Sequence, residues 1–256
     1  MEPTFTFVQA YPYAIPPMRA DKAASGVLPT IAFRHCEPVR TASSFGWYIF
    51  PPEDVVLRWD GADVLIRQEA GWEPLSQTML PDMGEYWDRC APESLRGMAP
   101  PFVSMLPVRG YVQIWSGLLC KAAPGWSVSV RSLVNIPSTN HYRCFEGVVE
   151  ADQFAPFPLF MNIQLLATNV DIVIPKVQPF FQIQPLLRQT YQGFAHESEV
   201  RSGLKDEESG ASLLTAEEWI GYRKTVRISQ TEGEEILIEG GSYTVDSRKR
   251  QRHSEE

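Results

Sequence analysis

The chain of 256 residues carries a formal net charge of −8, and it contains 21 prolines and four cysteines. Because binding to a phosphate backbone requires clustered lysine and arginine, this acidic composition argues against nucleic acid as a partner. No apolar stretch approaches the roughly 18 residues of a membrane span, and residues 1–4 lack the basic and apolar regions of a signal peptide. The cysteines form no CxxC pair, so we expect reduced thiols in a cytoplasmic protein that has no membrane partner.

The N-terminal residues 1–30 are rich in proline and aromatic residues. Phe5 and Phe7 predict a short strand, and the following prolines keep the next stretch extended. We therefore expect residues 1–30 to form an arm on the surface of a β domain that spans residues 31–192. Residues 30–33 predict another short strand at the start of that domain.

Strand signals and turns dominate the rest of this domain. Two alternating runs flank Asp60 and Gly61, and an Asp-Gly pair in this setting is a strong hairpin signal. Residues 71–100 instead have the spacing of one or two short helices. Further strand signals follow at about ten-residue intervals, which is typical of a sandwich or barrel; they cover residues 111–115, 118–121, 126–130, 145–150, 159–166, 171–174 and 180–183. The predicted fold class is all-β, a double-sheet barrel of jelly-roll or β-clip type with a short helical insertion and a C-terminal helix.

The C-terminal quarter of the chain is predicted in three parts. Residues 193–213 are charged and small and form a linker. Thr215 and Glu218 have the spacing of a capping box and start a helix within residues 214–247, where a weak hairpin or disorder are both possible after the helix. Residues 248–256 form a disordered basic tail, and the alternative is a localisation or nucleic-acid patch. The basic residues of the tail are Arg248, Lys249, Arg250 and Arg252.

Three segments together resemble an uncharacterised, mostly bacterial family that is known only as a domain of unknown function. They are Gly46 to Tyr48 with two prolines at 51 and 52, residues 112–118, and residues 123–127. The resemblance runs from about Phe33 to Tyr191 and supports a single β domain. Since the family has no established activity, the resemblance implies no catalytic residues.

A weaker resemblance concerns the order of three segments: Ser116 to Leu118, residues 146–152, and residues 181–183. Their order is similar to that of the dUTPase and dCTP-deaminase β-clip fold, in which a Ser-Gly loop contacts phosphates and a turn holds sugar and base. The resemblance implies a nucleotide-acting hydrolase with Ser116 at the phosphates and Glu150 in the turn. The sequence departs from the pattern, since Trp115 stands where that family has arginine and Glu150 where it has aspartate.

His35, Cys36 and Glu37 place three potential metal ligands beside the strand predicted at residues 30–33. In an extended segment His35 and Glu37 point to one face. There they could begin a cupin-like site for a divalent metal cofactor, with His141 from another strand as a further ligand. The alternative is a loop histidine and glutamate bonded to nearby backbone, because the His-x-His spacing of such sites is missing.

Two further polar groups are candidates for chemistry. Arg143 with Glu146 or Glu150 could position a charged ligand, since guanidinium binds carboxylate or phosphate in bidentate fashion. Glu150 and Asp152 share a face of an extended strand and could hold a cation or act as a base. The alternatives are a surface ion pair worth at most about 1 kcal/mol and a solvent-facing strand end. Trp126 is the aromatic residue best suited to line a pocket.

The preferred functional hypothesis is an enzyme that acts on a small polar metabolite in a barrel pocket and uses a divalent metal if one is bound. The alternatives are a non-catalytic module that binds a ligand, or assembles into a homo-oligomer through residues 5–15, and the nucleotide-acting hydrolase. The candidate site residues are Glu146, Glu150 and Arg143 for catalysis, Trp126, Ser116 and Asp152 for ligand binding, and His35, Glu37 and His141 for metal.

Overall fold

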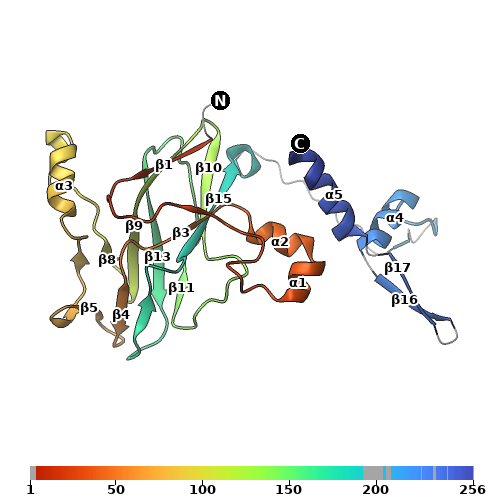
Figure 1. Cartoon of the computed structure of the whole chain (residues 1–256), viewed down its shortest axis with the longest axis horizontal. Coiled ribbons are helices and arrows are strands. Elements are labelled where there is room, and N and C mark those ends of the chain that lie inside the picture. Colours follow the sequence, from red (N-terminus) through yellow and green to blue (C-terminus); the bar gives the residue numbers. More distant parts are fainter. Residues whose placement is uncertain are drawn as a thin grey trace. The chain divides into compact units, whose positions relative to one another are not determined.

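The structure, a computed structural model, describes residues 4–192, 204–205, 209–225, 227–232, 235–240 and 242–255 (Figure 1). The chain divides into two compact units, and we describe each by itself. The β unit contains Met1–Leu28 and Ala42–Gly193, and the C-terminal unit contains Pro29–Thr41 and Phe194–Glu256. The C-terminal unit is therefore assembled from two segments that are far apart in the sequence.

The first sheet of the β unit has six strands in the order β11-β13-β9-β8-β7, with β1 also paired to β9. Burial alternates along β13, where Met161 and Ile163 are fully buried and Asn162 between them is half-buried. This alternation is what a strand produces when one face meets a core. The strands are β1 (Phe5–Gln9), β7 (Gln77–Thr78), β8 (Val103–Met105), β9 (Tyr111–Ala122), β11 (Tyr142–Cys144) and β13 (Phe157–Leu165).

The second sheet has five strands in the order β12-β10-β15-β3-β2, and the third has four in the order β14-β4-β5-β6. The second sheet contains β2 (Met18–Arg19), β3 (Trp47–Ile49), β10 (Trp126–Arg131), β12 (Gly147–Val149) and β15 (Phe181–Leu187). The third contains β4 (Val55–Trp59), β5 (Val64–Gln68), β6 (Gly71–Pro74) and β14 (Ile172–Ile174). The predicted hairpin is confirmed: β4 and β5 pair antiparallel, and Asp60 Oδ1 accepts the N–H groups of Ala62 and Asp63 at 2.8 and 2.7 Å.

One buried apolar cluster joins the three sheets. It includes Met161 from the first sheet, Phe181 from the second and Leu57 from the third. The predicted all-β class is confirmed, with antiparallel pairing throughout the three sheets. Each sheet has open ends in its strand order, however, so the sheets are not closed into a barrel.

Strand β9 is continuous where the sequence predicted two separate strands. Its pairing with β13 shifts register between Pro158 and Phe160, so the residues around Ser116 and Gly117 form a bulge. Gly117 has a φ of +77°, and a Cβ there would lie 2.9 Å from the side chain of Ala14. Glycine therefore lets the strand bulge while the N-terminal segment packs against it.

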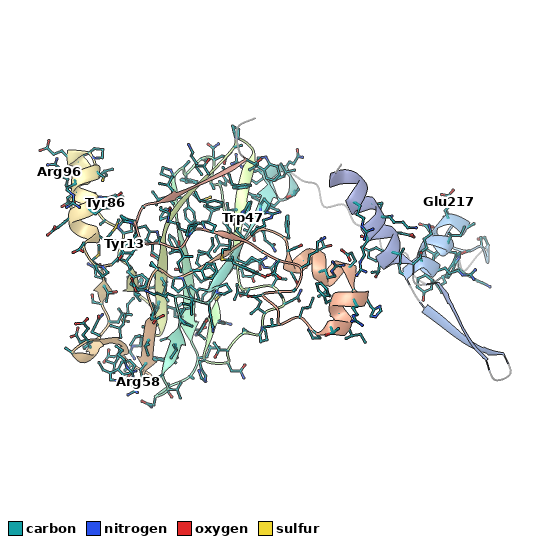
Figure 2. The ribbon with its side chains drawn as sticks, viewed as in Figure 1. Tyr13, Trp47, Arg58, Tyr86, Arg96 and Glu217 are labelled. Carbon is teal, nitrogen blue, oxygen red and sulfur yellow. The ribbon has the colours of Figure 1, made fainter. Side chains whose placement is uncertain are left out.

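The N-terminal segment is part of the core of its own unit. Strand β1 pairs with β9, as the strand prediction for Phe5 and Phe7 requires. Trp47, labelled in Figure 2, packs against the ring of Phe5 in a tilted geometry and against that of Phe7 edge-on, with ring centroids at 5.6 and 5.5 Å. Tyr11 and Ala14 are buried. Much of the apolar surface of residues 5–15, which we expected to be available to a neighbouring molecule, is thus already used within this chain.

Two short helices lie between β7 and β8, within residues 71–100 where the sequence predicted one or two: α3 (Met83–Cys90) and the 3₁₀ turn η1 (Glu93–Leu95). A further 3₁₀ turn, η2 (Arg188–Thr190), follows β15. Met83 is the buried residue of α3. Trp87 Nε1 donates to the Leu95 carbonyl at 2.9 Å and so ties η1 to α3.

The C-terminal unit is mainly helical. Its elements are α1 (Thr30–His35), α2 (Glu37–Ser43), whose last two residues belong to the β unit, α4 (Ala216–Thr225), β16 (Arg227–Glu232), β17 (Glu235–Gly240) and α5 (Tyr243–Glu255). The strand prediction for residues 30–33 is wrong, because Ile31, Ala32 and Phe33 are contiguous apolar residues without the alternation of a strand. Pro29 directly precedes this helix, a position where its missing N–H costs nothing.

The capping box at the start of α4 is confirmed. Thr215 N–H donates to Glu218 Oε2 at 2.6 Å, and Glu218 N–H donates to Thr215 Oγ1 at 3.2 Å. Helix α5 extends through residues for which we expected a disordered tail. Ser242, at its start, hydrogen-bonds with Asp246 through its side chain, which explains in part why a helix begins there.

Candidate functional site

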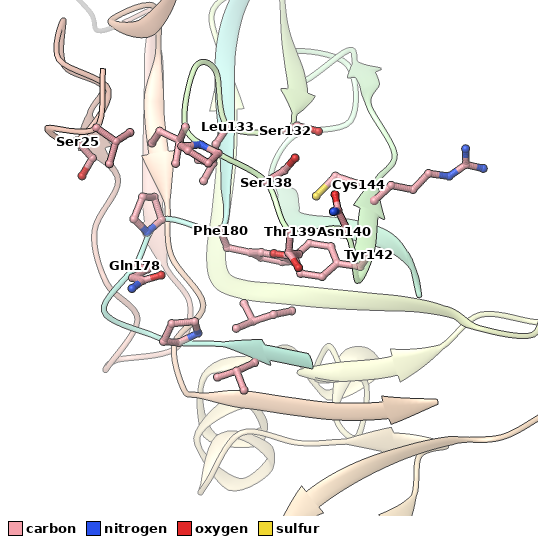
Figure 3. A pocket seen from close by; sticks show the side chains of 18 of the residues that line it. Ser25, Ser132, Leu133, Ser138, Thr139, Asn140, Tyr142, Cys144, Gln178 and Phe180 are labelled. Carbon is pink, nitrogen blue, oxygen red and sulfur yellow. The ribbon is translucent and has the colours of Figure 1, made fainter. Parts of the chain in front are cut away.

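A cavity of about 730 Å³ lies in the β unit (Figure 3). Its wall is formed by the loop of residues 132–140, called here the cavity loop, by strand β11, by the end of β14 and by the segment that leads to Phe180. Ser25 and Val27 add to the wall from the N-terminal segment. The volume is in the usual range for a small-molecule site, about 300–1,000 Å³.

The cavity loop is anchored by a buried amide. Gln182, in β15, is fully buried, and its Oε1 accepts the N–H of Val134 at 3.1 Å. Its Nε2 donates to the Phe45 carbonyl at 2.8 Å. Ser132 N–H also donates to Glu146 Oε1 at 3.3 Å, which fixes the start of the loop. The loop therefore has a defined conformation over the cavity.

Aromatic and neutral polar side chains meet inside the cavity. Tyr142 and Phe180 form an edge-to-face pair with ring centroids 6.2 Å apart. Burial raises the pKa of the Tyr142 hydroxyl to about 12 and that of the Cys144 thiol to about 11. Both groups are therefore neutral at physiological pH. Ser138, Thr139 and Asn140 contribute neutral donors and acceptors from the loop, as Figure 3 shows.

Arg143 is the one charged residue among the lining residues that the structure describes. Its guanidinium lies over the ring of Phe145, 5.1 Å from the centroid. Glu146, its predicted partner, instead pairs with Arg131 at 3.6 Å. Arg143 thus lines the cavity, whereas Glu146 contacts only the start of the cavity loop.

Glu150 and Asp152 come together at another place in the β unit. Both pair with Arg188, and the contact with Glu150 measures 4.0 Å. Asp152 also accepts the N–H of Gly125 at 2.9 Å, and Glu150 accepts a hydrogen bond from Gln192. The extended strand from which a shared face was predicted is absent, because β12 ends at Val149 and residues 151–153 form a turn; both carboxylates instead pair with Arg188.

Ser116 and Trp126 have structural contacts in the β unit. Ser116 is buried in the bulge, and its Oγ donates to the Leu159 carbonyl at 2.7 Å. This carbonyl lies opposite the bulge, at the shift in register. Trp126 packs edge-on against Phe5, with ring centroids at 5.9 Å. Neither residue lines the cavity.

The three metal-site candidates are divided between the two units. His35 ends α1 and Glu37 begins α2, so the extended segment from which we inferred a shared face is absent. Glu37 is 1% exposed and its Oε2 accepts hydrogen bonds from Arg40 and Arg248, both at 2.7 Å. His141 is an exposed residue of the β unit. Across the described residues, no group of three or more His, Cys, Asp or Glu side chains could hold a metal ion.

Sequence reasoning missed most of the cavity. The cavity loop was not identified, although its run of Asn135, Pro137, Ser138, Thr139 and Asn140 is typical of an irregular segment with many hydrogen-bonding groups. Phe180 was predicted only as part of a strand. No local pattern connects residue 180 with residue 142, because their contact depends on how two sheets pack.

No protein-family model matches the sequence, and no curated protein matches it. Within the described segments, no helix is long and apolar enough to cross a lipid bilayer. Among solved structures, the chain is similar to a mutant dUTPase from phage phi11 of S. aureus, with a TM-score of 0.39 and 12% identity over 80% of this chain and 99% of that chain. It is also similar to a mutant dUTPase of Staphylococcus bacteriophage 80alpha with dUpNHpp, with a TM-score of 0.36 and 13% identity over 82% of this chain and 96% of that chain. These scores are too low to carry a conclusion about function.

Proposed function

We propose that the β unit binds a small organic ligand in the 730 Å³ cavity and does not itself transform it. The observation that carries this proposal is the composition of the lining. The lining contains both apolar side chains, such as Ile136 and Phe180, and neutral hydrogen-bonding groups. Binding pockets combine an apolar wall with a few polar groups that fix orientation.

The titratable groups of the cavity favour binding over catalysis. General acid–base catalysis works best when the pKa of the catalytic group lies near the operating pH. The pKa values of Tyr142 and Cys144 lie far above neutrality, at about 12 and about 11. The described lining contains no His, Asp, Glu or Lys. An enzyme using Glu146 is the alternative, and it requires that carboxylate to leave Arg131 and the Ser132 N–H.

A fragment screen by ligand-observed NMR tests the proposal. Ser138 lines the cavity and is exposed, so the variant Ser138→Trp places an indole at the cavity wall, where it takes up part of the space for a ligand. The matched control is Ser94→Trp, which adds the same indole at an exposed position outside the cavity lining.

Fragments that bind the unmodified protein should bind Ser94→Trp equally and lose binding to Ser138→Trp. Equal binding to both variants would place the ligand elsewhere and contradict the proposal. Turnover of a bound fragment that disappears in Glu146→Gln would favour the enzyme alternative.

A further inference from the structure

Strand β11 has one edge without a partner strand among the described residues. It is the terminal strand of the six-stranded sheet and pairs with β13 on one side only. Phe145 N–H donates to the Asn162 carbonyl at 2.8 Å, and Leu166 N–H donates to the His141 carbonyl at 2.7 Å. In antiparallel pairing, alternate residues direct their main-chain groups at the partner strand. His141, Arg143 and Phe145 therefore face β13.

By the same alternation, the N–H and C=O groups of Tyr142 and Cys144 point away from β13. They present two donors and two acceptors, and among the described residues none of these four groups has a hydrogen-bond partner. An exposed edge of this kind is a template for pairing with another extended chain. Proline, which would block such pairing, is absent from β11.

This edge faces the cavity. Tyr142, Arg143 and Cys144 are consecutive and all three line it. Because successive side chains of a strand point to opposite faces, three consecutive lining residues mean that the cavity runs along the edge of β11 and not over one face. The unpaired main-chain groups are therefore among the groups that a ligand in the cavity would meet.

We propose that the ligand of this cavity is an extended peptide segment that adds to the edge of β11 as a further strand, an inference that rests on the proposed binding function. Peptide main chain offers donors and acceptors at the spacing that Tyr142 and Cys144 require, and such strand addition is a known mode of peptide recognition. Three peptide residues span about 10 Å in an extended strand. Two of them form hydrogen-bonded pairs with Tyr142 and Cys144.

The other lining residues define the side chains that such a peptide carries. The apolar part of the cavity wall favours an apolar residue in the peptide. It is formed by Leu133, Ile136, Val173 and Phe180. Arg143 is the single charged lining residue among those described, so an acidic residue beside the apolar one is favoured over a basic one.

The probe is a synthetic pool of acetylated, amidated hexapeptides, from which bound members are identified by mass spectrometry after gel filtration with the full chain. Dissociation constants of the best peptide are then measured for Cys144→Ala and Cys144→Pro. Both variants lack the thiol, but only proline also lacks the N–H at the edge, and proline is tolerated where that N–H faces away from the sheet.

The expected result is that the peptide binds Cys144→Pro at least about fivefold more weakly than Cys144→Ala, the cost of leaving one main-chain partner unsatisfied. Amide hydrogen exchange of Tyr142 and Cys144 should slow when the peptide binds. If Cys144→Pro fails to fold, the peptide carries the same test: N-methylation at the nitrogen that pairs with the edge should abolish binding, whereas N-methylation one residue along should not.

Two results overturn the inference and leave the proposed function intact. In one, fragments occupy the cavity and no peptide of the pool binds. In the other, the best peptide binds Cys144→Pro as well as Cys144→Ala and protects neither edge amide. If neither fragments nor peptides bind in a manner sensitive to Ser138→Trp, both the inference and the proposed function are wrong.

Discussion

The N–H of Val134 donates to Oε1 of Gln182 at 3.1 Å, and this bond links the cavity loop to a fully buried side chain of β15. The same amide donates to the Phe45 carbonyl at 2.8 Å. A single glutamine thus links two segments that precede it in the chain by 48 and 137 residues. The Gln182 amide therefore ties the cavity loop to the second sheet.

Gln182→Leu should destabilise the β unit and release the cavity loop. It removes the Gln182 partner of the Val134 N–H and of the Phe45 carbonyl, both part-buried bonds, and the loss should be at most about 1–3 kcal/mol for each. Urea denaturation measures the change in the free energy of unfolding. Gln184→Leu is the control, because Gln184 is half-buried and has only a 3.5 Å contact with Arg131. Equal losses in the two variants would contradict an anchoring role for Gln182.

Gly46→Ala should prevent the β unit from folding. Gly46 has a φ of +103°, and a Cβ there would lie 1.8 Å from the Ile183 carbonyl oxygen. Main chain cannot yield as a flexible side chain does, so we expect a loss of several kcal/mol or insoluble protein. The matched variant Gly125→Ala has a φ of +81° with no atom within 4 Å of the added Cβ. It should lose only about 1 kcal/mol, measured by thermal unfolding. A soluble, stable Gly46→Ala protein would count against this backbone contact.

Stability should fall at alkaline pH because three buried groups resist ionisation in the folded chain. Burial raises the pKa of Cys144 from 9.0 to about 11, that of Cys120 from 9.0 to about 12 and that of Tyr142 from 10.0 to about 12. A raised folded-state pKa gives stability that is complete below the unfolded-state pKa. That stability is lost as the pH rises through the folded-state values. Denaturation at a series of pH values should therefore show a decline from about pH 9 to pH 12.

The thiols give a second, local measurement of the same burial. Because the thiolate is the nucleophile, iodoacetamide at pH 8 should leave Cys120 and Cys144 unmodified. Cys90 is exposed and should react first. Mass spectrometry of the digested protein identifies the modified positions. Rapid labelling of Cys144 under native conditions would show that this thiol is more accessible than its raised pKa indicates.

Glu37→Ala should loosen the C-terminal unit. The Glu37 carboxylate is 1% exposed and accepts hydrogen bonds from Arg40 and Arg248. Removing it leaves two arginines without a buried partner, and breaking such pairs costs up to about 3–5 kcal/mol. Limited proteolysis should then cleave within α5 faster than in the unmodified chain. Glu93→Ala, at an exposed position, should leave the cleavage rate unchanged.

The elements that the sequence predicted well have local causes. The hairpin around Asp60 and the capping box of Thr215 and Glu218 each depend on residues within a few positions of one another. The alternation along β13 likewise depends on one strand and one core. Such features can be inferred from a short window because the interactions that stabilise them lie inside that window.

The functional residues were harder to predict, because their surroundings depend on distant segments. Ser116 resembled a phosphate-binding serine, but a bulge in β9 turns its hydroxyl to the Leu159 carbonyl. Glu150 and Asp152 were expected on one face of a strand, but they lie at a turn, and Arg188, which contacts both, could not be assigned to them from spacing alone. The shared face of His35 and Glu37 was predicted from an extended segment, whereas His35 ends helix α1 and Glu37 begins helix α2.

The ion pair of Glu37 with Arg248 joins residues 211 positions apart. During synthesis, α1 and α2 therefore leave the ribosome long before their partner helix exists. At roughly 5–20 residues per second the interval is about 10–40 s. Throughout this interval the Glu37 carboxylate lacks Arg248, one of its two arginine partners. The C-terminal unit is consequently completed only after the strands of the β unit have all been made.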